Sequence, residues 1–596
     1  MHAINKLTFL TFLTTASVSV LASSDKYNLH PTQFLPPVMD WHGNSEALIK
    51  SANKTPIEQS NFSKTPDYEQ TIAWLEKISQ QSPLIQLSYF GVSAQGRKLP
   101  LIHVSSNFKT KNRPTLLAQA GIHSGEIDGK DAGMMLLRDI ALGDKAALID
   151  DVDLLFVPIF NADGHENSSI YNRVNQRGPT NMGWRTTAQN INLNRDYAKA
   201  QSVEMKAMLK LINDYQPSLY LDLHVTDGSD YQYDITYGTA EKVSYSPAIA
   251  TWFANSYRPT IDKALTDNGH VPGPLVFAVD GNDFNKGIAE WASTPRFSDG
   301  YGAARHLPTV LVENHSLKPY KQRVLGTYIL IESSLKALKE HGDALALATS
   351  QDKAARPTSL PLGWDYNQPT TMAFKGIAFE QFDDPISGTK IIKWLGTPKL
   401  YPNLPVIPQN VPMHVTKVPA AYWLMPEQHE AISVLQAHGV TIEVLDQPQR
   451  LRLEQQRVFD EKFSATPYEG AQRVSAQFTA KMIDITLPKG AVKVSTDQPL
   501  GKLAFNLLEP MSADSFFQWG FFNTIFQRTE YIEAYAVVPL AKEMLAQNPK
   551  LQQAFEEKIK QDKEFASSPR ARLQWFYQRS PFYDRNHNRY PVLRQW

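Results

Sequence analysis

Short apolar runs alternate with helix-patterned stretches over the first 350 residues of this 596-residue chain. Residues 68–82 carry apolar side chains at helical spacing, and further helical patterns cover 126–142, 202–215 and 322–345. Between them lie the continuous apolar runs LIQLSYFG, LPLIHVS, PTLLAQAGIH, DLLFVPIF, SLYLDLHV and TVLVEN. Strands buried on both faces have this appearance, and helical crossovers between them make their pairing parallel. The pattern predicts an α/β fold with a mixed, mostly parallel sheet flanked by helices.

The pattern changes near residues 345–362, where a helical stretch runs into the proline-containing segment ARPTSLPLG. Residues 363–510 have β-rich patterning with one helical insert, and residues 511–596 are mostly helical. We therefore expect an α/β domain at 68–350, preceded by an irregular segment at 23–67. A β-rich domain and then a helical region follow it.

The N-terminus, MHAINKLTFLTFLTTASVSVLASSDK, places Lys6 before an apolar run that ends in Val20-Leu21-Ala22. This arrangement predicts a secretory signal peptide over residues 1–22, cut after Ala22. A membrane anchor is the alternative, but the run is short for a span and is interrupted by Thr and Ser. No later segment approaches about 20 apolar residues, so we expect no membrane span after cleavage.

Charge and cysteine content narrow the possible partners and compartments. Lys+Arg and Asp+Glu are equal at 60 each, so no bulk field attracts nucleic acid, and we expect none as a partner. The chain has no cysteine, which excludes disulfides, lipidated cysteine and thiol chemistry. An exported protein without disulfides is typical of a bacterial periplasm or growth medium, so we predict a periplasmic or secreted location.

Three separated residues suggest a metal site: His123 and Glu126 in GIHSGE, and His224 in LYLDLHVTDG. Two imidazoles and one carboxylate suit a catalytic zinc, which keeps a fourth position open. An HxxE pair alone is common by chance. Here, however, His123 follows one apolar run and His224 ends another, and the carboxyl ends of parallel strands meet at one edge of a sheet. We therefore predict one Zn²⁺ per chain at these residues.

The motifs HSGE, NADG, WR, NLNRDY, LDLH and LVENHSLKP occur in this order, and with them residues 65–345 resemble the zinc carboxypeptidase superfamily of the carboxypeptidase A type. The resemblance implies an enzyme that hydrolyses C-terminal peptide bonds of peptide substrates with zinc-activated water. It implies Glu313 as the general base and Arg185 as the residue that polarises the scissile carbonyl. Asn194 and Arg195 resemble the pair that holds the substrate's terminal carboxylate.

Peptide hydrolysis requires these residue types independently of the resemblance. Glu313 closes the apolar run LPTVLVE, where desolvation raises a carboxyl pKa towards a useful value for proton transfer. One arginine can stabilise an oxyanion, and another can pair bidentately with a carboxylate. Tyr301 is the nearest candidate for the family's mobile substrate-binding tyrosine. The segment 294–303 is expected to select the substrate side chain, although Arg296 and Asp299 within it could instead pair with each other.

One position departs from the family pattern. Two residues before Asn194 the family has an acid, and this chain has Asn192. That acid orients the first zinc histidine and raises its basicity. Asn192 can accept the same hydrogen bond but brings no charge, so we expect weaker zinc binding unless another acid, such as Asp128, compensates.

Two alternative functions remain open. Superfamily members also resemble amidases and endopeptidases that act on cell-wall peptides, which suits a periplasmic location, whereas the Asn194–Arg195 pair favours an exopeptidase. The other alternative is a non-catalytic peptide- or glycan-binding protein on the same scaffold, against which the intact ligand set and Glu313 argue. Aromatic residues near Trp519 are expected to form core rather than a sugar-binding platform.

Overall fold

The computed structural model describes residues 29, 31–50, 52–110, 112–240, 244–528 and 530–596. The predicted signal peptide lies outside these residues. Within the described part of the chain, no helix is both long enough and apolar enough to cross a membrane.

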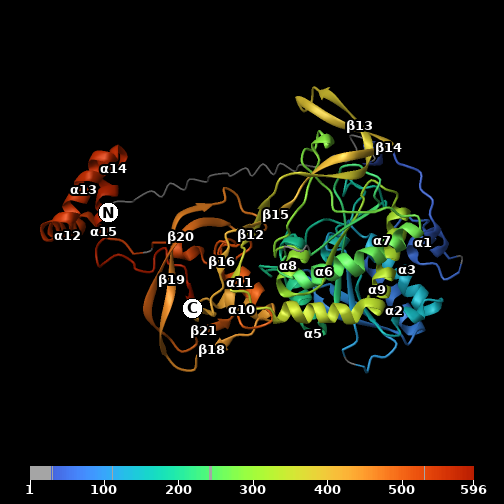
Figure 1. The fold of residues 1–596 in the computed structure, drawn as a ribbon, viewed down its shortest axis with the longest axis horizontal. Helices are drawn as coiled ribbons and strands as arrows, with labels where there is room; N and C mark the ends of the chain where they lie inside the picture. The colour runs from blue at the N-terminus through green and yellow to red at the C-terminus, as the bar shows by residue number, and fades with distance from the viewer. Residues whose placement is uncertain (1–28, 30, 51, 111, 241–243, 529) are drawn as a thin grey trace, which may run out of the picture.

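An eight-stranded sheet forms the centre of the N-terminal half, with the order β1-β2-β4-β3-β5-β10-β6-β7 (Figure 1). The central strands β4, β3, β5 and β10 run parallel, whereas β2 and β6 flank them in antiparallel pairing. The predicted mixed, mostly parallel sheet is therefore confirmed. Its strands are β1 (Ile85–Val92), β2 (Lys98–Val104), β3 (Thr115–Ala120), β4 (Asp153–Val157), β5 (Leu219–Val225), β6 (Ile235–Thr239), β7 (Pro272–Gly273) and β10 (Thr309–Asn314).

Helices cover both faces of this sheet. Alternate residues of a strand point to opposite faces. Accordingly, Leu116 and Ala118 of β3 belong to one core and Leu117 to another. The first core contains α2, α3, α7 and α9, and the second contains α5, α8 and residues of the C-terminal half. The helices of this half are α1 (Pro56–Gln59), α2 (Tyr68–Gln81), α3 (Asp128–Leu142), α4 (Ala162–Glu166), α5 (Val203–Tyr215), α6 (Pro247–Trp252), α7 (Arg258–Asp267), α8 (Ser298–Arg305) and α9 (Tyr320–Ala354).

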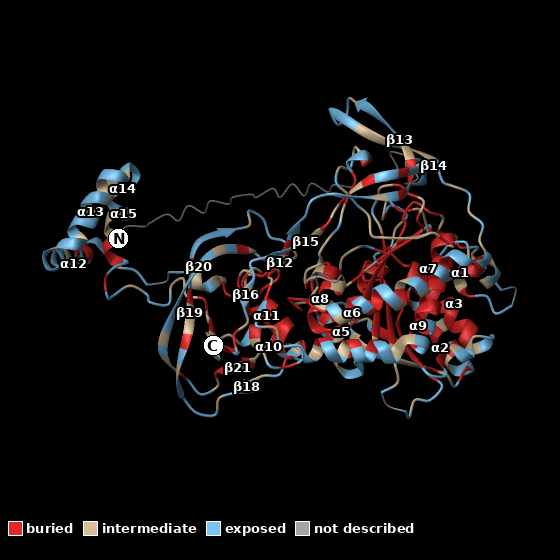
Figure 2. Cartoon of the chain, in the orientation of Figure 1, coloured by how far each residue is buried: buried red, intermediate tan, exposed pale blue. Residues whose placement is uncertain are grey.

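A six-stranded sheet of order β18-β21-β17-β22-β19-β20 organises the C-terminal half. The last strand of the chain, β22, lies between β17 and β19, so residues 511–596 supply a strand as well as helices. The strands are β17 (Ala421–Leu424), β18 (Glu443–Val444), β19 (Gln449–Phe463), β20 (Val474–Leu487), β21 (Val492–Ser495) and β22 (Val592–Gln595), with α10 (His429–Ala437) and α11 (Gly501–Leu508) packed nearby. Four further helices form a small cluster with its own core, which stands apart from this sheet in Figure 2: α12 (Ala534–Gln547), α13 (Pro549–Gln561), α14 (Lys563–Ser567) and α15 (Pro569–Tyr577).

A long and largely exposed hairpin projects from the upper edge of the molecule in Figure 2. Its strands β13 (Thr370–Asp384) and β14 (Thr389–Ile407) join β8 (Phe277–Ala278) and β9 (Ile288–Ala289) in a four-stranded sheet. Two smaller pairs complete the region: β11 (Ser359–Leu360) with β16 (Thr416–Lys417), and β12 (Gly363–Tyr366) with β15 (Gln409–Met413). Strand pairing therefore crosses the sequence position at which we expect a domain boundary.

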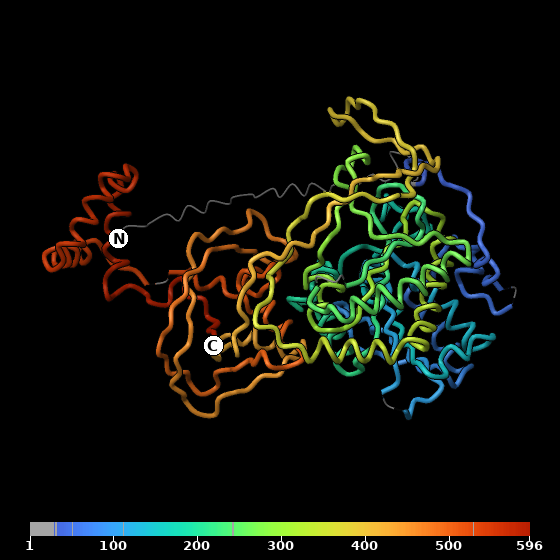
Figure 3. The backbone as a smooth tube through the Cα atoms, in the orientation of Figure 1, coloured from blue at the N-terminus to red at the C-terminus, as the bar shows by residue number. Residues whose placement is uncertain are grey.

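The two halves also share a hydrophobic core. One cluster joins Met205 of α5 and Tyr301 of α8 to Leu503 of α11 and Leu435 of α10. Polar contacts reinforce it, since Lys502 Nζ donates to the Tyr245 carbonyl oxygen at 2.8 Å. The backbone tube in Figure 3 shows the chain leaving the first lobe in yellow and building the adjoining orange lobe.

Candidate metal centre

The three predicted ligands converge at the carboxyl ends of β3 and β5. His123 and Glu126 lie in the turn between β3 and α3, and His224 lies on β5. All three are buried, and one ligand atom from each lies within 4.8 Å of the others. His123 Nδ1 is 3.1 Å from Glu126 Oε1, and His224 Nδ1 is 3.0 Å from Glu126 Oε2. Both imidazoles therefore present the same nitrogen to the central carboxylate.

The turn that carries the first two ligands depends on a glycine. The Glu126 amide donates to the His123 carbonyl oxygen at 2.8 Å, which folds the chain back on itself. A Cβ at Gly125 would lie 2.4 Å from Arg173 Cγ and 2.9 Å from the Gly183 carbonyl oxygen. Glycine is thus required here because side chain and backbone both pass close to the turn.

The donor set fits Zn²⁺, which binds imidazole nitrogen and carboxylate oxygen and leaves a position open in catalytic sites. Burial lowers the pKa of His123 to about 4, so this ring is neutral near pH 7, as a ligand must be. Burial also opposes the charged form of His224, but the carboxylates of Asp222 and Glu126 raise its pKa well above the usual value. Metal binding at His224 would therefore release a proton.

Each ligand histidine has a polar partner on its other ring nitrogen. Asn192 Oδ1 lies 2.9 Å from His123 Nε2, in the place where the family resemblance implies an acid. Asp128 does not compensate as suggested from the sequence, because it pairs with Arg323 at 3.2 Å. Instead, Asp222 Oδ2 lies 2.8 Å from His224 Nε2. The supporting carboxylate, that of Asp222, thus contacts His224 and not His123.

Sequence reasoning missed Asp222, although a signal was present. In the strand LYLDLHV, Asp222 and His224 are two positions apart and therefore share a face. Asp222 Oδ1 also accepts a hydrogen bond from Gln119 Nε2 of β3 at 2.8 Å, which fixes the carboxylate between the two strands.

Glu313 lies on β10 directly beside His224, its parallel pairing partner on β5. Its Oε2 atom is buried without a hydrogen-bond partner among the described residues. Burial raises the pKa of Glu313 to about 8, and the negative charges of Glu126 and Asp222 act in the same direction, against His224. A cation bound at the adjacent ligands would lower this pKa.

Two arginines contact the Glu126 carboxylate. Arg185, predicted from the sequence, places Nη1 3.3 Å from Oε1, and about a third of its side chain is exposed (34%). Arg173, which sequence reasoning missed, places Nη2 2.9 Å from the same oxygen. Its backbone has a φ of 55°, an uncommon conformation for a non-glycine residue and one often found at functional sites.

Asn194 and Arg195 lie together in a 3₁₀ turn over Leu193–Arg195. Arg195 Nη1 donates to the Asn194 carbonyl oxygen at 2.7 Å, and the guanidinium lies 4.4 Å over the Phe297 ring. Among the described residues no carboxylate pairs with Arg195, and the buried Asn194 Oδ1 has no hydrogen-bond partner. The pair is therefore available to an external carboxylate.

The structure places Tyr301 in the core and not at the metal cluster. Its side chain is fully buried on α8, and its hydroxyl accepts from Arg305 Nη1 at 2.8 Å and lies 3.0 Å from His438 Nδ1. The predicted role of Tyr301 in substrate binding is therefore corrected, because a satisfied core phenol has no access to a substrate.

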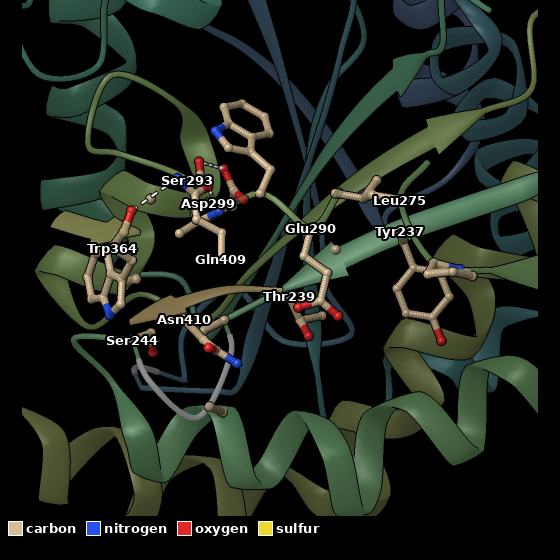
Figure 4. A pocket seen from close by; sticks show the side chains of 18 of the residues that line it. Tyr237, Thr239, Ser244, Leu275, Glu290, Ser293, Asp299, Trp364, Gln409 and Asn410 are labelled. Carbon is tan, nitrogen blue, oxygen red and sulfur yellow. Dashed lines mark hydrogen bonds between the residues drawn. The ribbon is translucent and has the colours of Figure 1, made fainter. Parts of the chain in front are cut away.

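The segment expected to select the substrate side chain borders a pocket of about 340 Å³ (Figure 4). Asp299, Gly300 and Ala303 line this pocket together with strand β6 and Trp364, but no predicted metal ligand does. Asp299 Oδ1 accepts from Ser293 Oγ at 2.5 Å. Arg296 pairs with Asp514 at 3.0 Å, so Arg296 and Asp299 are not partners of each other.

Comparison with known proteins identifies relatives of this chain. The zinc carboxypeptidase family model matches residues 71–294. Carboxypeptidase 2 of Trichophyton rubrum is 21% identical over 457 residues, which cover 72% of this chain and 78% of that protein. The inactive metallocarboxypeptidase ECM14 of Saccharomyces cerevisiae is 27% identical over 121 residues, or 19% of this chain and 28% of that protein. A solved metallo-carboxypeptidase from Burkholderia cenocepacia has a TM-score of 0.36 and 16% identity, covering 46% of this chain and 69% of that one.

The matched stretch contains the three metal-ligand candidates as well as Arg185 and Arg195, whereas Glu313 lies beyond it. The His–Glu–His cluster in the structure agrees with a family named for its zinc. The similarity to the zinc carboxypeptidase family model is thus confined to residues 71–294, the part of the chain that holds the His–Glu–His cluster.

Proposed function

We propose that this protein is a zinc metallocarboxypeptidase that removes C-terminal residues from peptides. The observation that carries the proposal is the buried His123–Glu126–His224 cluster beside the unpartnered carboxylate oxygen of Glu313. Other described carboxylates, such as Asp131 and Glu204, also have one buried oxygen without a hydrogen bond, so the position of Glu313 beside the ligand set is what distinguishes it. An unpartnered one next to a metal-ligand set suits a group that exchanges protons.

Different residues of the chain have different roles in the proposed hydrolysis. Zinc, when bound, supplies Lewis-acid polarisation of the scissile carbonyl and of a water molecule. Glu313 takes the proton of the attacking water and delivers it to the leaving nitrogen. Arg185 is exposed enough to turn from Glu126 towards the substrate and stabilise charge on the carbonyl oxygen. Arg195 and Asn194 bind the terminal carboxylate, which restricts cleavage to the chain end.

We also propose that the enzyme is exported, on the support of the signal-peptide pattern in residues 1–22 and the absence of cysteine. A bacterial periplasm or growth medium fits both features. Export can be tested by fractionating cells that express the full chain and determining the N-terminus of the mature protein, which should begin at Ser23.

Peptide digestion tests the activity. Zinc-loaded protein is incubated with peptides that differ only in a free or amidated C-terminus, and the products are identified by mass spectrometry. We expect stepwise loss of single residues from the free acids and at least about 10-fold slower cleavage of the amides, since the partly buried Arg195 guanidinium would lack its charged partner. Equal cleavage of both, or internal cuts, would favour a cell-wall amidase or endopeptidase. No cleavage of any peptide would favour a binding protein.

A further inference from the structure

A loop from the C-terminal half reaches the segment that carries Asn192 and Arg195. Residues 464–473, here called the tip loop, connect strands β19 and β20. Glu469 Oε2 accepts a hydrogen bond from the Asn192 backbone N–H at 2.9 Å, across 277 positions of sequence. Next to it, Tyr468 is an electrostatic neighbour of the Arg195 guanidinium.

The tip loop is a defined turn. Tyr468 and Ala471 exchange two backbone hydrogen bonds of 2.9 and 3.0 Å. Between them, Glu469 and Gly470 both have positive φ, at 49° and 76°. Two residues of positive φ form the type I′ turn that matches the twist of paired strands. Glutamate is strained at such a position, and strained residues cluster at functional sites.

Trp519 packs against Tyr468 of the tip loop. The Tyr468 ring stacks on the buried Trp519 ring with centroids 6.0 Å apart and an interplanar angle of 16°. Arg473 lies 4.5 Å over the same indole and donates to the Ala513 carbonyl oxygen at 2.6 Å. Tyr468 is therefore held in place by its packing on Trp519.

Tyr468 does not neutralise the positive charge of Arg195. Arg195 has the positive charges of Arg185 and Arg296 near it, and burial lowers its pKa. The phenol group of Tyr468 lies near this guanidinium without being a carboxylate partner for it. The carboxylate of Glu469, one residue further, bonds the Asn192 amide instead. This arrangement suits the positioning of Arg195 for an incoming carboxylate, not its neutralisation.

We propose that the tip loop is part of the substrate-binding site. Tyr468 positions Arg195 for the terminal carboxylate of a peptide, and Glu469 fixes the backbone of Asn192, whose side chain holds His123. Both are positioning residues. The inference rests on the proposed carboxypeptidase function for its substrate, but it assigns part of the site to the C-terminal half, outside the stretch that matches the family.

The first test separates binding from turnover in the zinc-loaded full chain. Tyr468→Phe should raise KM for a free-acid peptide about 10-fold and leave kcat within about threefold, the pattern of lost uniform binding. Tyr535→Phe is the matched control, because Tyr535 is exposed on α12. Equal KM values for Tyr468→Phe and Tyr535→Phe would overturn the role of Tyr468.

The second test reads the metal site without activity. Glu469→Gly removes the carboxylate while favouring the positive-φ turn, and it should weaken zinc binding about 10-fold in a chelator competition, the lower end for residues that support a ligand. Asp460→Gly is the matched control, since Asp460 is an exposed acid at a φ of 52° on the same hairpin. Unchanged zinc affinity in Glu469→Gly would overturn the role of Glu469.

A third measurement distinguishes failure of this inference from failure of the proposed function. Zinc-loaded Glu313→Gln protein is titrated with an N-acetylated dipeptide carrying a free or an amidated C-terminus. A preference for the free acid that Tyr468→Phe reduces supports the tip loop even if the wild-type protein hydrolyses nothing. A preference that Tyr468→Phe leaves intact overturns it even if hydrolysis is observed.

Discussion

The pKa of the Glu313 carboxyl group depends on its surroundings. Glu313 combines a buried, unpartnered carboxylate oxygen on β10 with three nearby carboxylates, those of Glu126, Asp227 and Asp222, and these features raise its pKa to about 8. Such a group binds and releases protons readily near neutral pH once a cation lowers that value.

Glu313→Gln keeps the shape of the side chain and removes the base. We expect unchanged zinc content and kcat reduced by about 10²–10⁴-fold on a free-acid peptide. Glu557→Gln, an exposed change on α13, serves as the control. Wild-type kcat in Glu313→Gln would remove this residue from the mechanism, and loss of zinc would make it a ligand.

The partners of the two histidines predict an order of zinc affinities. Asp222→Asn removes the carboxylate from His224 and should weaken zinc binding about 10–100-fold, whereas Asn192→Asp supplies one to His123 and should strengthen it. Chelator competition measures both, with exposed Asp343→Asn as the control. Equal affinity in wild type and Asp222→Asn would show that Asp222 only fills space.

The sequence was sufficient to predict the three residues of the metal-ligand cluster, and the contacts that it missed have a common cause. The ligands and Glu313 stand at the ends of recognisable strands, so their convergence follows from sheet topology. Arg173 and Glu469 lie in turns, and the hydrophobic pattern of the sequence does not predict the path of a turn. Their contacts with Glu126 and Asn192 arise only when distant segments pack together.

At the scale of elements, continuous apolar runs predicted every central strand of the first sheet, and the helix expected at 68–82 is α2. Two-residue strands such as β8 and β9 carry too few positions to show a pattern. Within residues 511–596, expected to be mostly helical, separate helices begin after Asn548 and Asp562, whose side chains cap α13 and α14.

A buried ion pair ties the short helix α1 to α3. Arg138 Nη1 lies 2.6 Å from Glu58 Oε2, and the Thr55 amide donates to the same carboxylate at 2.8 Å. Burial alone would raise the pKa of Glu58, but the hydrogen bonds from Arg138 and Thr55 lower it below 4.5. The folded state therefore prefers the ionised carboxylate.

Glu58→Gln should lower the free energy of unfolding by about 1–3 kcal/mol near pH 7, because a buried charge-assisted bond is lost. Since the folded pKa is depressed, this stabilisation is fully present above the unfolded pKa near 4.5 and disappears as the pH falls through the folded value. Urea unfolding of both proteins between pH 3 and 7 checks this. A difference that stays constant down to pH 3 would contradict the ionic origin.

At the scale of the whole molecule, the α/β half and the C-terminal half share a hydrophobic core, so we expect them to fold together. Residues 23–350 produced alone would uncover the apolar side chains of α5 and α8 that now pack on α10 and α11. We expect this fragment to aggregate or to bind a hydrophobic dye, unlike the full chain. A monomeric fragment that melts cooperatively would show that the α/β half folds independently, as the pattern change at 345–362 suggests.

We expect His123, Glu126 and His224 to bind zinc through the two Nδ1 atoms and the carboxylate between them. Anomalous diffraction at the zinc absorption edge, from crystals of the zinc-loaded protein, tests it directly. We expect one peak per chain, about 2.0–2.1 Å from His123 Nδ1 and His224 Nδ1 and within about 2.2 Å of a Glu126 oxygen. A peak elsewhere in the chain, or none at this cluster, would contradict it.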